Sequence, residues 1–320
     1  MPELMAQRDA FGKALVDLGA QNERVVVVDA DLASSTKASM FEAAYPERFF
    51  QMGVTEQNIM GVAAGLATMG FVPFADTFAC FATKRALDQI RISIAQPRPH
   101  VIVHGGYGSL FVGKSGKTHQ AHQDMAIMRS MPNMTVVAPG DGVEARKAVF
   151  AVADYEGPIY LRLTRDPCPV VFGDDYDFRI GPALVVREGA DVTIMTTGIM
   201  LGRAVEAAEA LQSEGVSAHI LHVPTLKPLD VAAIVAAAEK TGIVVTAEEH
   251  TVIGGLGGAV AEVLGEHRPT PMKRVGLADV YSESAANDEL IEKYGLTSHH
   301  IADAARALLA RRRAGTPATV

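Results

Sequence analysis

Residues 53–68 read GVTEQNIMGVAAGLAT, and this run predicts a helix over residues 55–69. One stripe of that helix has only small side chains, so another backbone could approach it closely: Gly61, Ala64, Gly65 and Thr68. Glu56 stands at the start of the helix. A carboxyl group at the buried end of such a stripe is costly to ionise, so Glu56 is expected to keep its proton and to donate a hydrogen bond to a ring nitrogen or an oxygen. The alternative is a glutamate that only complements the helix dipole.

Short β-branched runs alternate with longer helical patterns on both sides of this segment. The expected strands of the first half are residues 24–29, 49–52, 100–104, 135–138 and 159–163. The expected helices, besides 55–69, are residues 7–18, 78–95 and 142–153. This alternation is typical of βαβ units, so a first domain over residues 1–168 is expected to contain a parallel sheet covered on both faces.

Residues 166–177 are rich in Pro, Gly and Asp and are interpreted as the domain linker. The alternation then resumes, with strands at 192–197, 217–223 and 243–247 and helices at 202–213, 230–240 and 256–266. A second α/β domain is therefore expected over residues 182–314. The tail, residues 311–320, is expected to be a frayed helix end followed by a disordered terminus.

The composition of the 320 residues, 48% hydrophobic and 21% charged, is typical of a soluble globular protein. A net charge of −8 argues against a nucleic-acid or anionic-membrane partner. Two cysteines are too few for a disulfide framework, and no apolar run has the length of a signal-peptide core or a membrane span. A cytoplasmic protein is therefore expected.

Residues 104–124 form a glycine-rich stretch after a predicted strand, which is where ligands approach the backbone in α/β sheets. His119 lies in this loop and is favoured as a proton-handling or hydroxyl-binding residue. A metal site with His122 and Asp124 has only weak support from the H-x-x-H spacing, so no metal ligand is assigned.

Two further pairs of residues suit a ligand. Phe78 and Phe81 lie one helical turn apart and form either a core stripe or a stacking platform for a flat ring. Arg8 and Arg165 suit oxyanions because the guanidinium group forks onto phosphate, although single arginines are more often surface or ion-pair residues.

Six ordered motifs together resemble the transketolase family of thiamine diphosphate enzymes, specifically the C-terminal subunit of a split transketolase. They span almost the whole chain: Ala30-Asp31-Leu32, Gly53-Val-Thr-Glu56, Thr77-Phe-Ala-Cys-Phe81, Gly116-Lys-Thr-His119-Gln120, Leu163-Thr-Arg165 and Glu248-Glu-His250-Thr. The resemblance implies a pyrimidine-binding domain over residues 1–168 and a transketolase C-terminal domain over residues 182–314. It implies transfer of a two-carbon ketol unit from a ketose phosphate to an aldose.

The resemblance also implies roles for individual residues. Glu56 is implied to hydrogen-bond the aminopyrimidine of the cofactor and to activate it through its imino tautomer. Phe78 and Phe81 are implied to stack on the pyrimidine, with Asp31 close to the cofactor, and His119 is implied to contact the donor hydroxyls. The sugar phosphate is implied to be held by Arg8, Ser35 and Arg165.

Three positions depart from the family pattern. Ser115 replaces an aspartate that recognises a donor hydroxyl, Tyr107 replaces a second histidine, and Lys84 replaces an aromatic residue of the cofactor wall. Ser115 and Tyr107 remain substrate-binding candidates, but they cannot form the charge-assisted hydrogen bond of a carboxylate. A shifted sugar preference, such as an unusual or branched ketose phosphate, is therefore expected.

The family binds the diphosphate and its metal through a separate N-terminal domain with a Gly-Asp-Gly…Asn motif, which this sequence does not contain. The resemblance implies a partner subunit of about 270 residues that holds the diphosphate and Mg²⁺ or Ca²⁺. Activity is expected only in the assembled protein, as an α2β2 heterotetramer.

Three other interpretations remain. The β subunit of a 2-oxo acid dehydrogenase shares the two-domain layout and the Glu-Gln-Asn helix, and a 1-deoxyxylulose-phosphate synthase fragment would use pyruvate as donor. A non-catalytic scaffold of the same fold is the third. The Thr-His-Gln motif and the two arginines favour transketolase.

Overall fold

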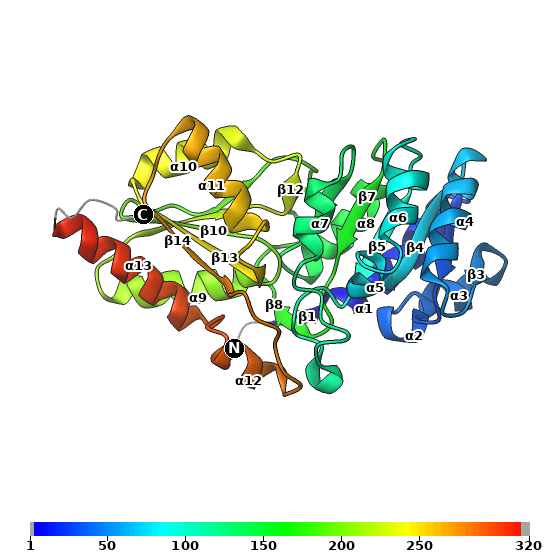
Figure 1. Cartoon of the computed structure of the whole chain (residues 1–320), viewed down its shortest axis with the longest axis horizontal. Helices are drawn as coiled ribbons and strands as arrows, with labels where there is room; N and C mark the ends of the chain where they lie inside the picture. Colours follow the sequence, from blue (N-terminus) through cyan, green and yellow to red (C-terminus); the bar gives the residue numbers. More distant parts are fainter. Residues whose placement is uncertain (1–2, 315–320) are drawn as a thin grey trace.

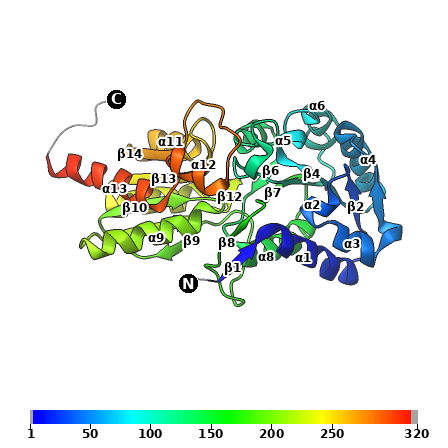
Figure 2. The ribbon, with the colours of Figure 1, turned by 90° about the horizontal axis from the view of Figure 1, so that it is seen from below.

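The computed structural model describes residues 3–314, which form two α/β domains side by side along the long axis of the molecule (Figure 1). The first half of the chain, blue to green, lies at one end, and the second half, yellow to red, lies at the other. The same separation is visible after a quarter turn (Figure 2). Each domain is a mainly parallel sheet covered by helices on both faces, so the expected fold class of two parallel-sheet α/β domains is confirmed.

The first sheet has seven strands in the order β12-β6-β7-β5-β4-β2-β3. Six of them come from the first domain and are mutually parallel: β2 (Val25–Asp29), β3 (Phe49–Gln51), β4 (Val72–Phe78), β5 (Ile102–Gly106), β6 (Thr135–Val137) and β7 (Ile159–Arg162). The seventh, β12 (Thr225–Lys227), comes from the second half of the chain and pairs antiparallel with β6. Every residue of β2 is buried, as a sheet covered on both faces requires.

Helices cover both faces of this sheet. One face packs against α1 (Gln7–Gln21), α3 (Ser39–Ala44) and α8 (Gly142–Ala153). The other packs against α4 (Glu56–Thr68), the π-helical turn η2 (Ile90–Ala95) and α7 (Asp124–Ser130). Shorter turns lie in the connections: α2 (Ala33–Thr36), η1 (Pro46–Arg48), α5 (Ala79–Ala82), α6 (Leu87–Gln89) and η3 (Gly113–Ser115).

The second sheet has five strands in the order β14-β13-β10-β11-β9. They are β9 (Leu184–Arg187), β10 (Val192–Thr196), β11 (Ala218–His222), β13 (Val244–Thr251) and β14 (Met272–Leu277), and only β9 runs antiparallel to its neighbour. One face carries α9 (Met200–Ser213) and α13 (Ser298–Arg313), with α12 (Asn287–Lys293) beside them; the other carries α10 (Val231–Thr241) and α11 (Leu256–His267).

The two domains are joined by more than one connection. Strand β1 (Leu4–Ala6) pairs antiparallel with β8 (Pro167–Pro169), so the first residues of the first domain lie beside the residues that lead into the second domain. Strand β12 of the second half of the chain adds an edge strand to the first sheet, next to β6. Within residues 3–314, no helix is long and apolar enough to cross a membrane.

Two segment predictions are wrong. Residues 78–95 are not one helix, because Phe78 ends β4 and the chain then forms α5, α6 and η2. Strand β4 itself is absent from the predicted strands, and it contains Pro73, which lacks the N–H that a central strand normally uses. Pro73 nevertheless pairs with Val26 in a strand that is buried at every position.

The interpretation of two further segments changes. The predicted linker, residues 166–177, begins with β8 and is therefore partly sheet. Residues 311–313 form the last turn of α13, and residues 315–320, the expected disordered terminus, lie outside the described residues.

Candidate active site

The predicted site residues gather because parallel strands end at the same edge of a sheet. Asp31 follows β2, Glu56 follows β3, Phe78 ends β4, Tyr107 follows β5 and Arg165 follows β7. The strand order therefore brings together residues that are far apart in the sequence.

Glu56 is the first residue of α4, and its side chain is 2% exposed. Arg85 contacts it: Nη1 of Arg85 donates to both carboxylate oxygens at 3.0 Å. The expected role of Glu56 as a hydrogen-bond donor is therefore not seen in this structure, where its carboxyl group accepts from a cation. The Arg85 guanidinium also lies over the Phe81 ring, 5.3 Å from its centre. Sequence reasoning missed Arg85 because no short-range pattern connects residues 29 positions apart.

The small-residue stripe of α4 does not bury Glu56. A Cβ added at Gly61 or Gly65 would meet nothing within 4 Å. The stripe lines an open pocket of about 450 Å³ against residues 93 and 97–99. Within residues 3–314, the expected close approach of another backbone is not made.

An aromatic wall lies beside Glu56. The rings of Phe78 and Phe81 stack with their centres 5.9 Å apart, and Tyr107 stacks on Phe78 at 4.1 Å. His119 meets both phenylalanines edge-on, at 6.2 and 5.4 Å. The platform and the loop histidine predicted from distant motifs are thus in contact.

Two arginines lie close to Tyr107. Nη1 of Arg8 donates to the Tyr107 hydroxyl at 2.9 Å and to the backbone oxygen of Ser35 at 3.2 Å. The guanidinium carbons of Arg8 and Arg165 lie 5.9 and 5.6 Å from the centre of the Tyr107 ring. The two predicted oxyanion ligands and Ser35 therefore lie around one tyrosine, whose backbone adopts a left-handed φ of 58°.

Other predicted residues lie at the margins of this group. Asp31 is exposed and has a φ of 63°, and its N–H and that of Gly53 both donate to Gln51 Oε1 at 3.0 Å. This shared acceptor places Asp31 beside the segment that leads to Glu56. Ser115 and Lys84 are exposed.

A buried polar network that sequence reasoning missed lies beneath the site. Asp76 contacts His104 Nδ1 and the Thr36 hydroxyl, each at 2.6 Å. Burial, followed by the charge and hydrogen bond of Asp76, raises the pKa of Asp29 to about 7. Asp29 and Asp76 are thus two buried carboxyl groups, and the charge of Asp76 adds to burial in favouring the protonated form of Asp29.

Asp29→Asn is expected to flatten the pH dependence of stability. A carboxyl group whose pKa is higher in the folded than in the unfolded protein stabilises the fold when protonated, and this contribution is lost as the pH rises through about 7. Between pH 5 and pH 8 the unmodified protein should therefore lose about 2 kcal/mol of unfolding free energy relative to Asp29→Asn. Guanidinium unfolding at both pH values measures this difference. The exposed Asp154→Asn is the matched control, and equal pH slopes for Asp29→Asn and the unmodified protein would contradict the raised pKa of Asp29.

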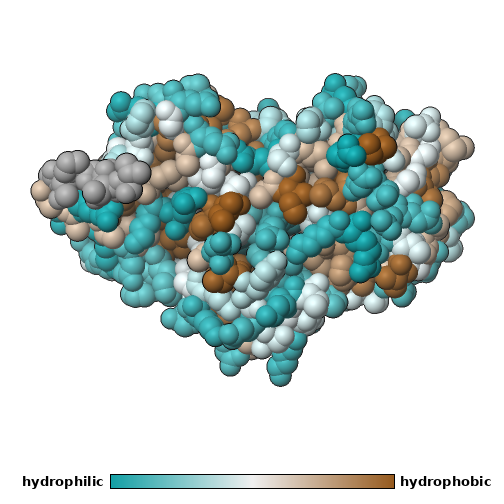
Figure 3. Space-filling view, in the orientation of Figure 1, coloured by the Kyte–Doolittle hydropathy of each residue, from teal (hydrophilic) through white to brown (hydrophobic). Residues whose placement is uncertain are grey.

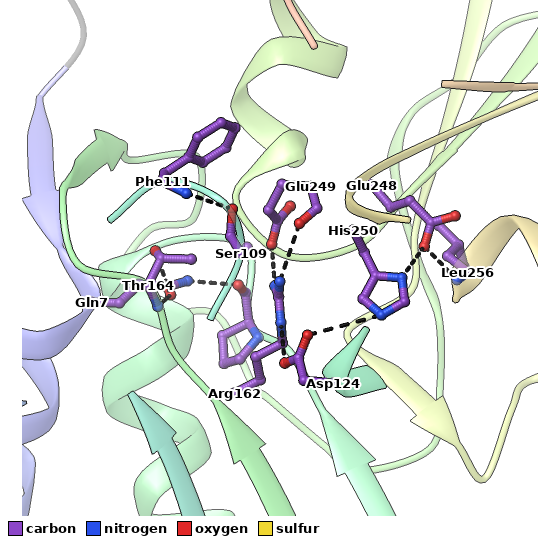
Figure 4. A network of polar contacts seen from close by, with 12 residues as sticks. Gln7, Ser109, Phe111, Asp124, Arg162, Thr164, Glu248, Glu249, His250 and Leu256 are labelled. Atoms are coloured by element: carbon purple, nitrogen blue, oxygen red, sulfur yellow. Dashed lines mark hydrogen bonds and ion pairs between the residues drawn. The ribbon is translucent and has the colours of Figure 1, made fainter. Parts of the chain in front are cut away.

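The motif Glu248-Glu-His250 lies in the seam between the domains rather than in the site (Figure 4). Arg162, at the end of β7, is the central cation of this group. Its Nε donates to the carboxylate of Asp124 at 2.8 Å. Its Nη1 donates to the carboxylate of Glu249, and its Nη2 donates to the backbone oxygen of Glu249 at 3.2 Å. Burial raises the pKa of Glu248 to about 7 and lowers that of His250 to about 4. Glu249 and His250 contact Arg162, Asp124 and Ala126 across the domain boundary, whereas Glu248 accepts the N–H groups of Leu256 and Gly257 within the second domain.

Comparison with known proteins identifies the family of both domains. The family model for the transketolase pyrimidine-binding domain matches residues 3–169, and the one for the transketolase C-terminal domain matches residues 181–301. A 6-deoxy-6-sulfo-D-fructose transketolase subunit of Clostridium sp. is 41% identical over 305 residues, covering 95% of each chain. One of the apulose-4-phosphate transketolase subunits of Phocaeicola vulgatus is 35% identical over 299 residues, covering 93% of this chain and 96% of that one.

Two solved structures are similar over nearly the whole chain. A split gene transketolase, described as an inactive β4 tetramer, superposes with a TM-score of 0.90 at 49% identity, covering 96% of this chain and 99% of that one. Transketolase from Leishmania mexicana superposes with a TM-score of 0.81 at 24% identity. The match covers 97% of this chain and 46% of the Leishmania chain, so the two share the fold. The chain belongs to the transketolase family, and its two domains correspond to those of a C-terminal subunit of a split transketolase.

Proposed function

We propose that this chain provides the pyrimidine-binding half of a two-subunit transketolase, which transfers a two-carbon ketol unit from an anionic ketose to an aldose. One observation carries the proposal: a buried carboxyl group, an aromatic wall and two arginines lie in succession along one sheet edge. A cofactor ring and an anionic sugar need these groups in this order.

The residues beside Glu56 fit the aminopyrimidine of thiamine diphosphate. Phe81 offers a partly exposed ring that stacks on the buried Phe78, and Glu56 offers a buried carboxyl group that would hydrogen-bond a ring nitrogen. When bound, thiamine diphosphate supplies the nucleophile and the electron sink for cleavage of the carbon–carbon bond. Asp31 would lie close to the cofactor, and Arg85 would have to share Glu56 or turn outward, which its 52% exposed side chain allows.

The residues around Tyr107 fit the donor sugar. Arg8, Arg165 and Ser35 would hold its anionic end, because guanidinium groups form paired hydrogen bonds with oxyanions. His119 and Ser115 would meet the hydroxyl groups near the carbonyl. The relatives support an anionic end of either kind, since one is named for a sulfonated sugar and the other for a sugar phosphate.

The departures from the family pattern support a shifted sugar preference. Ser115 and Tyr107 are neutral where transketolases carry an aspartate and a histidine, so the donor hydroxyls are recognised without a carboxylate. A donor panel in which xylulose 5-phosphate is the best substrate would argue against this part of the proposal.

A partner subunit would complete the site. We infer that it carries the diphosphate-binding domain and most of the ligands of Mg²⁺ or Ca²⁺, in an α2β2 assembly. The naming of relatives as subunits, and the description of the split gene β4 tetramer as inactive, support this division.

The test is reconstitution with the diphosphate-binding subunit, identified as the protein that co-purifies or as the product of the neighbouring reading frame. The chain alone is expected to show no ketol transfer, and the pair to show it. The kcat/KM of anionic donors should exceed that of uncharged counterparts by about a hundredfold. An uncharged donor would lose the charge-assisted contacts to both Arg8 and Arg165. Robust transfer by the chain alone would contradict the proposal.

The same preparation separates the alternatives. Lipoyl-dependent oxidative decarboxylation would identify a 2-oxo acid dehydrogenase subunit, and condensation that requires pyruvate would identify a 1-deoxyxylulose-phosphate synthase. The relatives named as transketolase subunits, which are 41% and 35% identical over nearly the whole chain, favour ketol transfer over these two reactions.

A further inference from the structure

The loop that carries Ser115 and His119 is closed at its base by its own domain. Ser109 and Ala121 exchange two backbone hydrogen bonds, of 2.9 and 2.8 Å, in an isolated antiparallel bridge. From this base, residues 110–120 extend to the edge of the second domain, where they lie beside α12 at the lower tip of the molecule (Figure 1).

Asn287, the first residue of α12, holds the near side of the loop. Its Oδ1 accepts the N–H of Gly113 at 2.8 Å, and its Nδ2 donates to the backbone oxygen of Phe111 at 3.3 Å. The same Nδ2 donates to the carboxylate of Asp166, next to Arg165. One side chain of the second domain therefore binds the loop backbone at two points.

The segment before α12 holds the far side of the loop. Ser282 is fully buried and donates to Gln120 Oε1, while Gln120 Nε2 donates to the backbone oxygen of Glu283 at 3.1 Å. Between these attachments, Gly116 has a φ of 71° and packs so closely that a Cβ there would overlap the hydroxyl of Ser284.

The attachments leave the predicted substrate residues accessible. Gly113, Gly116 and Gln120 are held, whereas Ser115 is exposed and His119 is half-buried. The tip of the molecule, where Figure 1 places this loop, is largely hydrophilic (Figure 3). The loop backbone is thus fixed from outside while its polar side chains remain available to a ligand.

We propose that residues 282–287 of the second domain form a strap that positions the donor-binding loop and thereby sets the affinity for the donor sugar. Ser282, Ser284 and Asn287 are positioning residues in this scheme, since they act through the loop. The inference rests on the proposed function for the role of the loop in donor binding. It assigns to the C-terminal domain an indirect part in sugar recognition, through the position of the loop.

The physical reason is preorganisation. Ordering a free backbone costs about 1–2 kcal/mol per residue, so a loop that is already ordered binds its ligand without that cost. A loosened loop must be ordered by the donor itself, which weakens donor binding more than it slows the chemical step.

Asn287→Asp tests the strap. This variant keeps the oxygen that accepts the N–H of Gly113 but loses the N–H that donates to the Phe111 carbonyl. It also places a second negative charge next to the carboxylate of Asp166. We expect amide hydrogen exchange of residues 109–121 in the chain to become at least about tenfold faster. In the reconstituted pair we expect the donor KM to rise about tenfold while kcat changes less than about threefold.

The double variant Asp166→Asn/Asn287→Asp exchanges the two groups and restores the hydrogen bond between the side chains. It is expected to recover part of the loop protection and part of the rise in donor KM, because the hydrogen bond to Phe111 is not restored. Two controls should leave the amide hydrogens of residues 109–121 as slow to exchange as in the unmodified protein. They are Asp166→Asn alone and Glu292→Gln, which changes an exposed residue of α12.

The strap is overturned if Asn287→Asp leaves amide exchange of residues 109–121 unchanged, or if exchange accelerates without a change in donor KM. A parallel fall of kcat and thermal stability with an unchanged KM would also overturn it. Absence of ketol transfer in the unmodified pair would instead contradict the proposed function, and the exchange experiment would still test the strap.

Discussion

Glu56→Gln in the reconstituted pair is expected to lower kcat by at least about a hundredfold. The amide keeps the size of the side chain but cannot take up or release a proton. Glu56 is 1% exposed, so no water can substitute for it. Steady-state transfer with a saturating donor measures the loss, and Glu56→Ala should abolish transfer altogether.

A fold defect cannot account for this loss. Arg85, the partner of Glu56, is 52% exposed and can turn to solvent, so the unfolding free energy should change by less than about 1 kcal/mol. Glu42→Gln, on an exposed position of α3, removes a carboxylate outside the site and should retain full activity. Unchanged turnover of Glu56→Gln would favour the non-catalytic scaffold.

Arg162→Met is expected to lower the free energy of unfolding by about 3–5 kcal/mol. The Arg162 side chain is 1% exposed and lies between the fully buried carboxylates of Asp124 and Glu249. Methionine fills similar space but leaves two buried negative charges without a cation. Guanidinium unfolding, followed by the midpoint at constant slope, measures the loss.

A surface ion pair provides the matched control for Arg162. Arg91 and Asp88 are 60% and 68% exposed, so Arg91→Met should cost less than about 1 kcal/mol. Adding Glu249→Gln to Arg162→Met should recover part of the loss, because one of the uncompensated charges is removed. A stable Arg162→Met protein would indicate that the seam does not depend on this cation.

Much of the candidate site could be predicted because its residues are recognisable by type and local context. Phe78, Phe81 and His119 are predictable as a platform and a loop histidine, and they are in edge-on or stacked contact. Arg8 and Arg165 are predictable as oxyanion ligands, and they flank one tyrosine. Their roles toward cofactor and sugar remain predictions.

Other features could not be predicted because their cause is not local. Strand β4 contains Pro73, which lacks the N–H that a central strand normally uses, yet the strand forms because it is buried between neighbouring strands. The small-residue stripe of α4 suggests a packing surface, yet within the described chain it lines an open pocket. In both cases the surroundings, not the residue, determine the outcome.

Sequence alone was sufficient for the α/β class, the family and the types of side chain at the site, because strand–helix alternation and short motifs are properties of neighbouring residues. Tertiary structure alone revealed that Arg85 binds Glu56 and that Asn287 holds Gly113, contacts that join residues 29 and 174 positions apart. Such contacts depend on where folded backbones pass one another, and no spacing rule along the chain encodes that distance.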